Sequence, residues 1–288
     1  VTVVIQSNAA GSATLSGTTS LTTVGGVATF SNLSIDLPGN GYTLRFVSGS
    51  LTPVVSESFN VLPAFSGASG YTCASSPCGG DPILVGTNFI YPGSEAIWSF
   101  GVSSPSSPTL MTSIQTAGFE HTHSGVIGNS LITMIKDSLY VKMNVYSIAN
   151  PNSFQLLSTT DLIGAPQGFA IKNNLVFVSL GVYGVRIYDI SNPSTPSFVG
   201  SYSVSLQSSA GLKIIGNKMY IAYQNYGFVI VDITNPATPV FVGRYDTPNI
   251  ANFVDVAGNY AYVADSSSVK IIDISVPATP TLAATIAS

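Results

Sequence analysis

His121 and His123, the two histidines of the chain, are the residues whose type and spacing could best hold a metal ion. In an extended segment, residues two apart project to one face, so both imidazoles could meet the same ion. Glu120 would lie on the opposite face, and a third ligand would have to come from elsewhere in the fold. We weigh these metal-ligand candidates against an exposed pair that only makes hydrogen bonds. We favour the second interpretation and expect no cofactor.

Cys73 and Cys78 are the only cysteines, and small and turn-forming residues surround them. A zinc site would need two more ligands, and neither the haem nor the redox motif has this spacing. We therefore predict a local disulfide, which implies an oxidising compartment and a secreted, extracellular or cell-surface protein. The sequence begins at Val1 without a basic and apolar leader, so we expect a mature or partial chain.

Aspartates recur once per repeat, three or four residues before a proline, and could be mistaken for a ring of catalytic carboxylates. A catalytic site is built from different residues at one place, whereas a structural turn uses the same residue type at the same position of every repeat. Aspartate side chains in turns accept hydrogen bonds from backbone N–H groups. We assign them to structural turns. The turn residues are Asp189, Asn192, Pro193, Asp232, Asn235, Pro236, Asp273 and Pro277.

Composition excludes several classes of function. Only 8% of residues are charged, against about 25% in an average soluble protein, and the net charge is −4. There is no basic stripe for a phosphate backbone, no apolar run of the ~18 residues that a membrane span needs, and no nucleophile-elbow motif. We expect no nucleic-acid partner, no membrane span and no enzymatic activity.

Two further features could take or carry sugars. Asn32-Leu33-Ser34 is an N-glycosylation sequon, so Asn32 would be modified where the source glycosylates. Tyr183, Tyr223 and Tyr226 could stack on a glycan, although packing inside the core is the default role of such aromatics.

The elements that position these residues repeat along the chain. Turns at Val85–Asn88, Ile135–Ser138, Ile171–Asn174, Ile215–Lys218 and Ala257–Tyr260 have third residues that advance from 87 to 259 in four steps, a mean of 43. Each unit contains four short apolar strands, and prolines separate the third from the fourth. This is typical of propeller blades. A segment at 119–128, which carries both histidines, is expected to be an insertion before the second divergent copy.

The repeats resemble a known family. Ile271-Ile272-Asp273-Ile274-Ser275, the Asn-Pro-x-x-Pro segments that begin at Asn192 and Asn235, and the segment 259–265 resemble the LVIVD-repeat propellers of bacterial and archaeal surface proteins. The resemblance implies a β-propeller of about five four-stranded blades over 81–288, and it is most specific in the last three repeats.

The segment before the repeats alternates apolar and polar residues between Gly and Asn turns, as sandwich strands do. Its run 26–35 and its end at 58–61 resemble the immunoglobulin-like domains of bacterial surface proteins. We predict a small immunoglobulin-like β-sandwich over 1–62 and a linker with the disulfide over 63–80. Such domains have a strand before the one that begins here at Val1, so the module would be open along one edge; an incomplete chain is the alternative.

An open edge can receive a strand from another chain. We therefore expect an extracellular or cell-surface structural protein that self-assembles into a fibre, sheath or surface layer, with other copies of itself or another surface protein as partners. The alternative is an adhesin or glycan-binding propeller that acts as a monomer.

Overall fold

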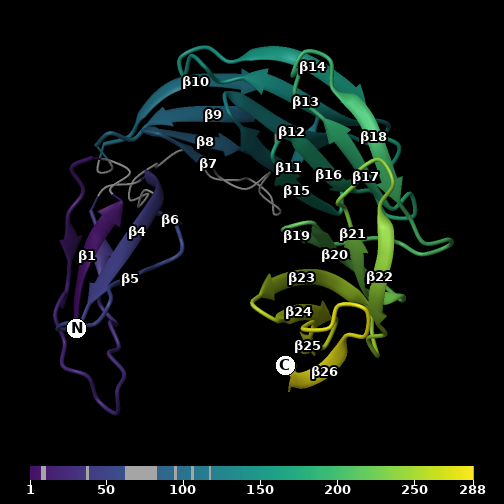
Figure 1. Ribbon diagram of the computed structural model, residues 1–288. Helices are drawn as coiled ribbons and strands as arrows, with labels where there is room; N and C mark the ends of the chain where they lie inside the picture. The colour runs from purple at the N-terminus through teal and green to yellow at the C-terminus, as the bar shows by residue number, and fades with distance from the viewer. Residues whose placement is uncertain are drawn as a thin grey trace.

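The computed structural model describes residues 1–7, 11–36, 39–61, 83–93, 96–104, 107–116 and 118–287, and every regular element within them is a β-strand. Figure 1 shows five sheets that follow one another along a curve, with the N-terminal strands at one end and the C-terminal strands at the other. Each of these five sheets has four strands, and every pairing within them is antiparallel.

We number these sheets in chain order. The first contains β7 (Ile83–Val85), β8 (Asn88–Pro92), β9 (Ala96–Gly101) and β10 (Thr109–Gln115). The second contains β11 (Glu120–Ile127), β12 (Ser130–Lys136), β13 (Val141–Ser147) and β14 (Gln155–Asp161). The third contains β15 (Gly168–Lys172), β16 (Leu175–Ser179), β17 (Val185–Asp189) and β18 (Ser197–Tyr202). The fourth contains β19 (Leu212–Ile215), β20 (Lys218–Tyr223), β21 (Gly227–Asp232) and β22 (Val240–Tyr245). The fifth contains β23 (Ala251–Ala257), β24 (Tyr260–Asp265), β25 (Ser268–Asp273) and β26 (Thr281–Ala287).

The same two-residue turn joins the first and second strands of all five sheets. Its first residue has a positive φ, which glycine adopts without strain and asparagine tolerates. The carbonyl of its second residue accepts a hydrogen bond from the residue after the third strand, for example from Ile190 N–H to Asn174 at 2.9 Å. The five first residues are Gly86, Gly128, Asn173, Gly216 and Gly258, with φ between 54° and 59°.

This turn corrects the predicted alignment of the second repeat. Ile135–Ser138 does not join the first two strands, because β12 runs to Lys136 and the chain then turns into β13. The first turn of the second sheet is Gly128-Asn129. The segment predicted to be an insertion is instead mostly β11, the first strand of this sheet, so the second repeat has the same four strands as the others.

The core lies between neighbouring sheets. We call the face of a sheet that contacts the preceding sheet its leading face, and the opposite face its trailing face. Phe177 and Ile187, on the trailing face of the third sheet, pack against Met219 and Ile221 on the leading face of the fourth. Equivalent apolar clusters join the first sheet to the second, the second to the third and the fourth to the fifth. Each cluster therefore connects sheets that are neighbours along the chain.

Within the described residues, no neighbouring sheet covers the trailing face of the fifth sheet. Tyr220 in the fourth sheet and Tyr262 in the fifth occupy the same position, yet Tyr220 is 7% exposed and Tyr262 is 36% exposed. Phe253 and Ile286 on this face are 60% and 55% exposed. The leading face of the first sheet, at the other end of the series, is not exposed in this way, because Leu84 and the apolar residues that cluster with it there are buried.

The N-terminal part forms a separate small sheet. β1 (Thr2–Ser7) pairs with β4 (Gly39–Val47), which also pairs with β5 (Val54–Val55) and β6 (Phe59–Val61). β2 (Leu15–Ser16) and β3 (Ser34–Ile35) form a two-stranded ladder. The structure therefore shows an all-β chain whose four-stranded antiparallel sheets are consistent with a β-propeller. The described residues contain no helix that is long and apolar enough to cross a membrane.

Candidate functional site

The two histidines lie in β11, in a strand rather than in an exposed loop. A β-bulge falls between them, since His121 is opposite Ile135 whereas His123 is opposite Met134. His121 contacts the first sheet, where its Nδ1 lies 2.6 Å from the carbonyl oxygen of Gly93, and the ring of His123 lies 6.4 Å from that of Phe169 in the third sheet. The prediction of one shared face was wrong, because a bulge interrupts the alternation of side chains.

His121 is a buried and neutral side chain. It is 3% exposed, and burial lowers its pKa below the ordinary value, an effect that the hydrogen bond to Gly93 only partly offsets. Because the carbonyl can only accept, Nδ1 carries the proton and donates it. Within the described chain, Nε2 has no hydrogen-bond partner. The described residues hold no group of three or more His, Cys, Asp or Glu side chains that could bind a metal ion.

The recurring aspartates lie in turns after the third strand of their sheets. Oδ1 of Asp189 accepts the N–H of Ser191 at 2.7 Å, and Asp232 and Asp273 accept the equivalent bonds at 2.7 and 2.8 Å. Hydrogen bonds stabilise the charged form, so the pKa of each carboxyl lies below its usual value; the main cause is the side-chain bond to Ser191 for Asp189, the side-chain bond to Thr234 for Asp232 and the backbone bond to Ser275 for Asp273. Each aspartate belongs to a different sheet, and the structure brings no two of them together at one site.

The proline segments contact the preceding sheet. Gly200 in β18 lies against the carbonyl oxygens of Pro236 and Ala237, and Gly243 in β22 lies against that of Pro277. In the second sheet the equivalent residue is Ser158, whose hydroxyl donates to the carbonyl of Pro193 at 2.7 Å. Asn192 and Asn235 order these segments, because their Oδ1 atoms each accept a backbone N–H two residues on, at 3.2 Å. These residues therefore hold adjacent sheets together.

The three tyrosines weighed for glycan stacking do not form one surface. Tyr223 is fully buried and touches the ring of Tyr226 edge-on, and burial raises its pKa. Tyr226 is covered by Arg244, whose guanidinium lies 3.8 Å from the ring centroid. Tyr183 is 49% exposed.

Two sequence predictions concern other parts of the chain. Asn32 is exposed, and its side-chain amide exchanges hydrogen bonds of 3.0 Å with the backbone N–H and the hydroxyl of Thr18. Cys73 and Cys78 lie outside the described residues.

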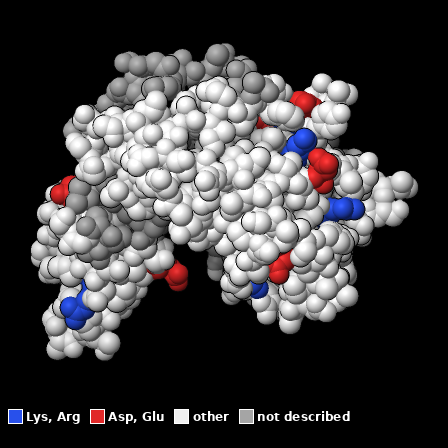
Figure 2. All heavy atoms as spheres, turned by 90° about the horizontal axis from the view of Figure 1, so that it is seen from above, with Lys and Arg blue, Asp and Glu red and all other residues white. Residues whose placement is uncertain are grey.

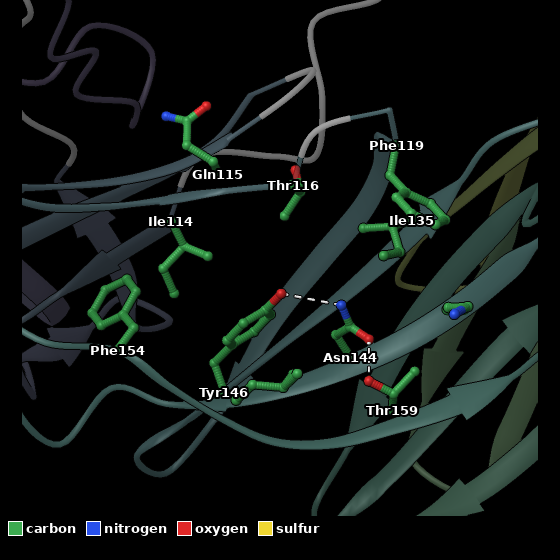
Figure 3. A pocket seen from close by; sticks show the side chains of 11 residues that line it. Ile114, Gln115, Thr116, Phe119, Ile135, Asn144, Tyr146, Phe154 and Thr159 are labelled. Carbon is green, nitrogen blue, oxygen red and sulfur yellow. Dashed lines mark hydrogen bonds between the residues drawn. The ribbon is translucent and has the colours of Figure 1, made fainter.

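A pocket that the sequence did not predict opens between the first two sheets (Figure 3). Its volume is ≈540 Å³, within the range of small-molecule sites. Tyr146 and Asn144 from β13 and Thr159 from β14 supply a hydrogen-bonded polar group, and apolar side chains flank it. The lining residues are Ile114, Gln115, Thr116, Phe119, Ile135, Lys142, Asn144, Tyr146, Phe154, Leu156 and Thr159.

A second hollow lies in the N-terminal part. It has a volume of ≈410 Å³ and lies between β1 and the segment from Ala13 to Thr19. Val3, Val4 and Ile5 supply its β1 wall. It therefore borders the edge of β1 that does not face β4.

Comparison with known proteins supports the fold. Three stretches match the LVIVD repeat, at residues 163–204, 208–247 and 250–287, and they contain the third, fourth and fifth sheets. No curated protein matches the chain significantly. The crystal structure of the computationally designed Ika8 protein is similar with a TM-score of 0.55 and 13% identity, over 71% of this chain and 60% of that one. The chain thus spans about 60% of the length of that protein. It carries three LVIVD repeats in an all-β fold that is consistent with a β-propeller.

Proposed function

We propose that this chain is a non-catalytic structural protein of the cell surface or the extracellular space, and that it assembles with further copies by strand addition at β1. In this proposal the five sheets are the blades of a propeller that serves as a rigid body, and the N-terminal part is an immunoglobulin-like module that joins one copy to the next. The open edge of β1 carries the proposal.

β1 is an end strand of its sheet, and its outer edge is paired only at its beginning. The N–H of Val3 donates to Thr19, and the N–H of Leu21 donates to Val1, both at 2.9 Å. Backbone groups of a strand point alternately to its two sides, so Ile5 is the next residue whose groups face this edge. No strand pairs with the edge there in the part of the chain that the structure describes. The 410 Å³ hollow borders the same residues and could receive side chains of an added strand.

We propose β26 of a second copy as the added strand. All seven of its residues are exposed, and none carries a charge. It pairs with β25 on one side only, so its other edge offers free backbone groups. A contact between β26 of one copy and β1 of the next is head-to-tail, and such contacts propagate into a fibre unless the rotation closes a ring.

The charge distribution favours dense association. Figure 2 shows a face on which a few charged side chains are scattered among uncharged ones. With a net charge of −4 over 288 residues, little like-charge repulsion opposes the approach of copies.

The test is the assembly state of the purified chain, measured by sedimentation velocity and electron microscopy over a range of concentrations. We expect fibres from the wild type. Ile5→Pro removes an outward N–H at an edge position, which the β1–β4 ladder tolerates, and Ile286→Lys places a charge on the donor edge. Both variants should remain dispersed and folded.

Leu110→Lys is the matched control for the donor strand, because Leu110 lies in an outermost strand and is 48% exposed, close to the 55% of Ile286. It should assemble as the wild type does. A wild type that stays monomeric at every concentration, or fibres that persist in both edge variants, would contradict the proposal.

The adhesin alternative predicts ligand binding by the monomer. The pocket between the first two sheets is the observation that favours it.

A further inference from the structure

The polar side chains of the pocket form a chain of hydrogen bonds, drawn as dashed lines in Figure 3. Thr159 Oγ1 donates to Asn144 Oδ1 at 2.9 Å, and Asn144 Nδ2 donates to the hydroxyl of Tyr146 at 3.1 Å. Asn144 and Tyr146 are 6% and 3% exposed. This leaves the second N–H of Asn144 and the O–H of Tyr146 as buried donors without an acceptor within the described chain. The pocket therefore offers hydrogen-bond donors to a ligand.

More such groups gather at the same interface. Ser99, Thr116, His121 and Thr133 each hold a buried polar atom without a hydrogen-bond partner in the described chain. They belong to the first sheet, the second sheet or the connection between them, and Thr116 lines the pocket itself. Buried polar atoms are almost always hydrogen-bonded, so a concentration of unsatisfied ones indicates a place where water or a ligand binds.

One of these polar groups stands at a position that is aliphatic in later sheets. Thr133 lies on the leading face of the second sheet, where the third, fourth and fifth sheets have Val178, Ile221 and Val263. Asn144, opposite Thr133, occupies a position that is Arg186, Val229 and Lys270 in those sheets, so a polar side chain there is not peculiar to the second sheet. Aliphatic residues satisfy sheet packing at the position of Thr133, so its hydroxyl adds a polar group that packing does not require.

Lys142 is the one charged side chain among the residues that line the pocket. Its Nζ lies 5.7 Å from the centroid of the Phe119 ring and 5.4 Å from that of Tyr140, and it forms no ion pair with the described carboxylates. A cation held over aromatic rings without a counter-ion can accept an anionic ligand group. Phe119 and Phe154 add apolar surface on which the C–H face of a sugar ring can lie.

We propose that this pocket binds an acidic sugar, a hexuronate unit of a glycan, with the carboxylate at Lys142 and the ring hydroxyls at Asn144, Tyr146 and Thr116. The donors, the single cation and the aromatic walls together fit a ligand that is rich in acceptors, negatively charged and apolar on one face. The proposal is independent of assembly, because no pocket residue belongs to β1 or β26.

Titration calorimetry and amide chemical shifts test the site, with glucuronate and galacturonate as probes and glucose and galactose as their neutral counterparts. We expect the uronates to bind about tenfold or more tightly than the hexoses, since a hydrogen bond to a charged group is stronger than a neutral one. Lys142→Met should remove this preference, and Thr159→Val should weaken uronate and hexose alike.

Lys136→Met is the matched control, because Lys136 lies in the same sheet, pairs with Glu120 at 3.5 Å and does not line the pocket. It should leave uronate binding unchanged. Using the Ile286→Lys background keeps the protein dispersed, so a failure of binding is distinguished from a failure of assembly. Absence of uronate binding at millimolar concentration, equal affinity for hexose and uronate, or an unchanged preference in Lys142→Met would overturn the proposal.

Discussion

Gly200→Ala tests whether the proline segments hold neighbouring sheets together. A Cβ at residue 200 would lie 2.5 Å from the carbonyl oxygen of Pro236 and 2.7 Å from that of Ala237, where ordinary contact begins beyond 3.4 Å. The atoms that it meets are backbone, so no flexible side chain can move aside. The fourth sheet would have to shift away from the third, or the turn would have to deform.

Overpacking of this kind typically costs ~1–3 kcal/mol, and one carbon against two carbonyl oxygens should lie in the upper half of that range. For a chain of this size each 1 kcal/mol lowers the melting temperature by ~2–4 °C. We therefore expect Gly200→Ala to melt ~4–12 °C below the wild type, in thermal denaturation followed by circular dichroism.

Ala284 provides the control at the same position of the fifth sheet. It pairs with Ile271 as Gly200 pairs with Ile187, but it is exposed, and no further sheet in the part of the chain that the structure describes covers it. Ala284→Gly should change the melting temperature by less than ~2 °C. A Gly200→Ala protein that melts within that margin of the wild type would refute the steric argument.

Three further predictions concern stability. The pKa of His121 is lower in the folded protein than in the unfolded chain, so the unfolded chain binds a proton first as the pH falls below about 6.5. Protonation therefore favours unfolding, and the urea concentration at the unfolding midpoint should decrease between about pH 8 and pH 5. His121→Asn, which keeps a donor for Gly93, should reduce that decrease, and an unchanged pH profile would be evidence against a buried neutral histidine. Asp189→Ala removes a turn bond at the surface and should lower the melting temperature by about 2 °C, with a larger loss contradicting the turn assignment. Tyr220→Ser should destabilise by ~2–4 kcal/mol in urea denaturation, whereas Tyr262→Ser at the uncovered equivalent position should cost less than half as much; equal losses would mean that both faces are covered.

The repeat period was predictable because apolar runs, Gly or Asn turns and Asp-x-x-x-Pro segments recur locally, and the last three copies match the LVIVD repeat. The second copy was misaligned because two of its connections, Gly128-Asn129 and Asp137-Ser138, both consist of turn-forming residues. The positive φ of Gly128 distinguishes the first turn, and the sequence does not report φ. Period alone therefore predicts how many residues a unit has more reliably than where it begins.

The site could be predicted less well. The bulge between His121 and His123 follows from how β11 pairs with β12, and nothing in Glu120-His121-Thr122-His123 signals it. The pocket depends on the register that brings Asn144 opposite Thr159, and on the approach of the first sheet. With the correct alignment, the polar Thr133 at a position that is aliphatic in the last three repeats would have been a usable signal. The immunoglobulin-like sandwich and the disulfide stay predictions.

Because its trailing face is uncovered, the fifth sheet should be less stable against local unfolding than the inner sheets. Each inner sheet packs against two neighbours, whereas the apolar cluster of the fifth sheet is shared with the fourth sheet alone. In arrays where only adjacent units interact, stability is close to a sum of unit and interface contributions, so a unit with one interface opens first. Amide hydrogens of β25 should then exchange faster than those of β21, although both strands are central in their sheets. Any partner that covers Tyr262 and Phe253 would slow that exchange and make the last sheet as persistent as the others.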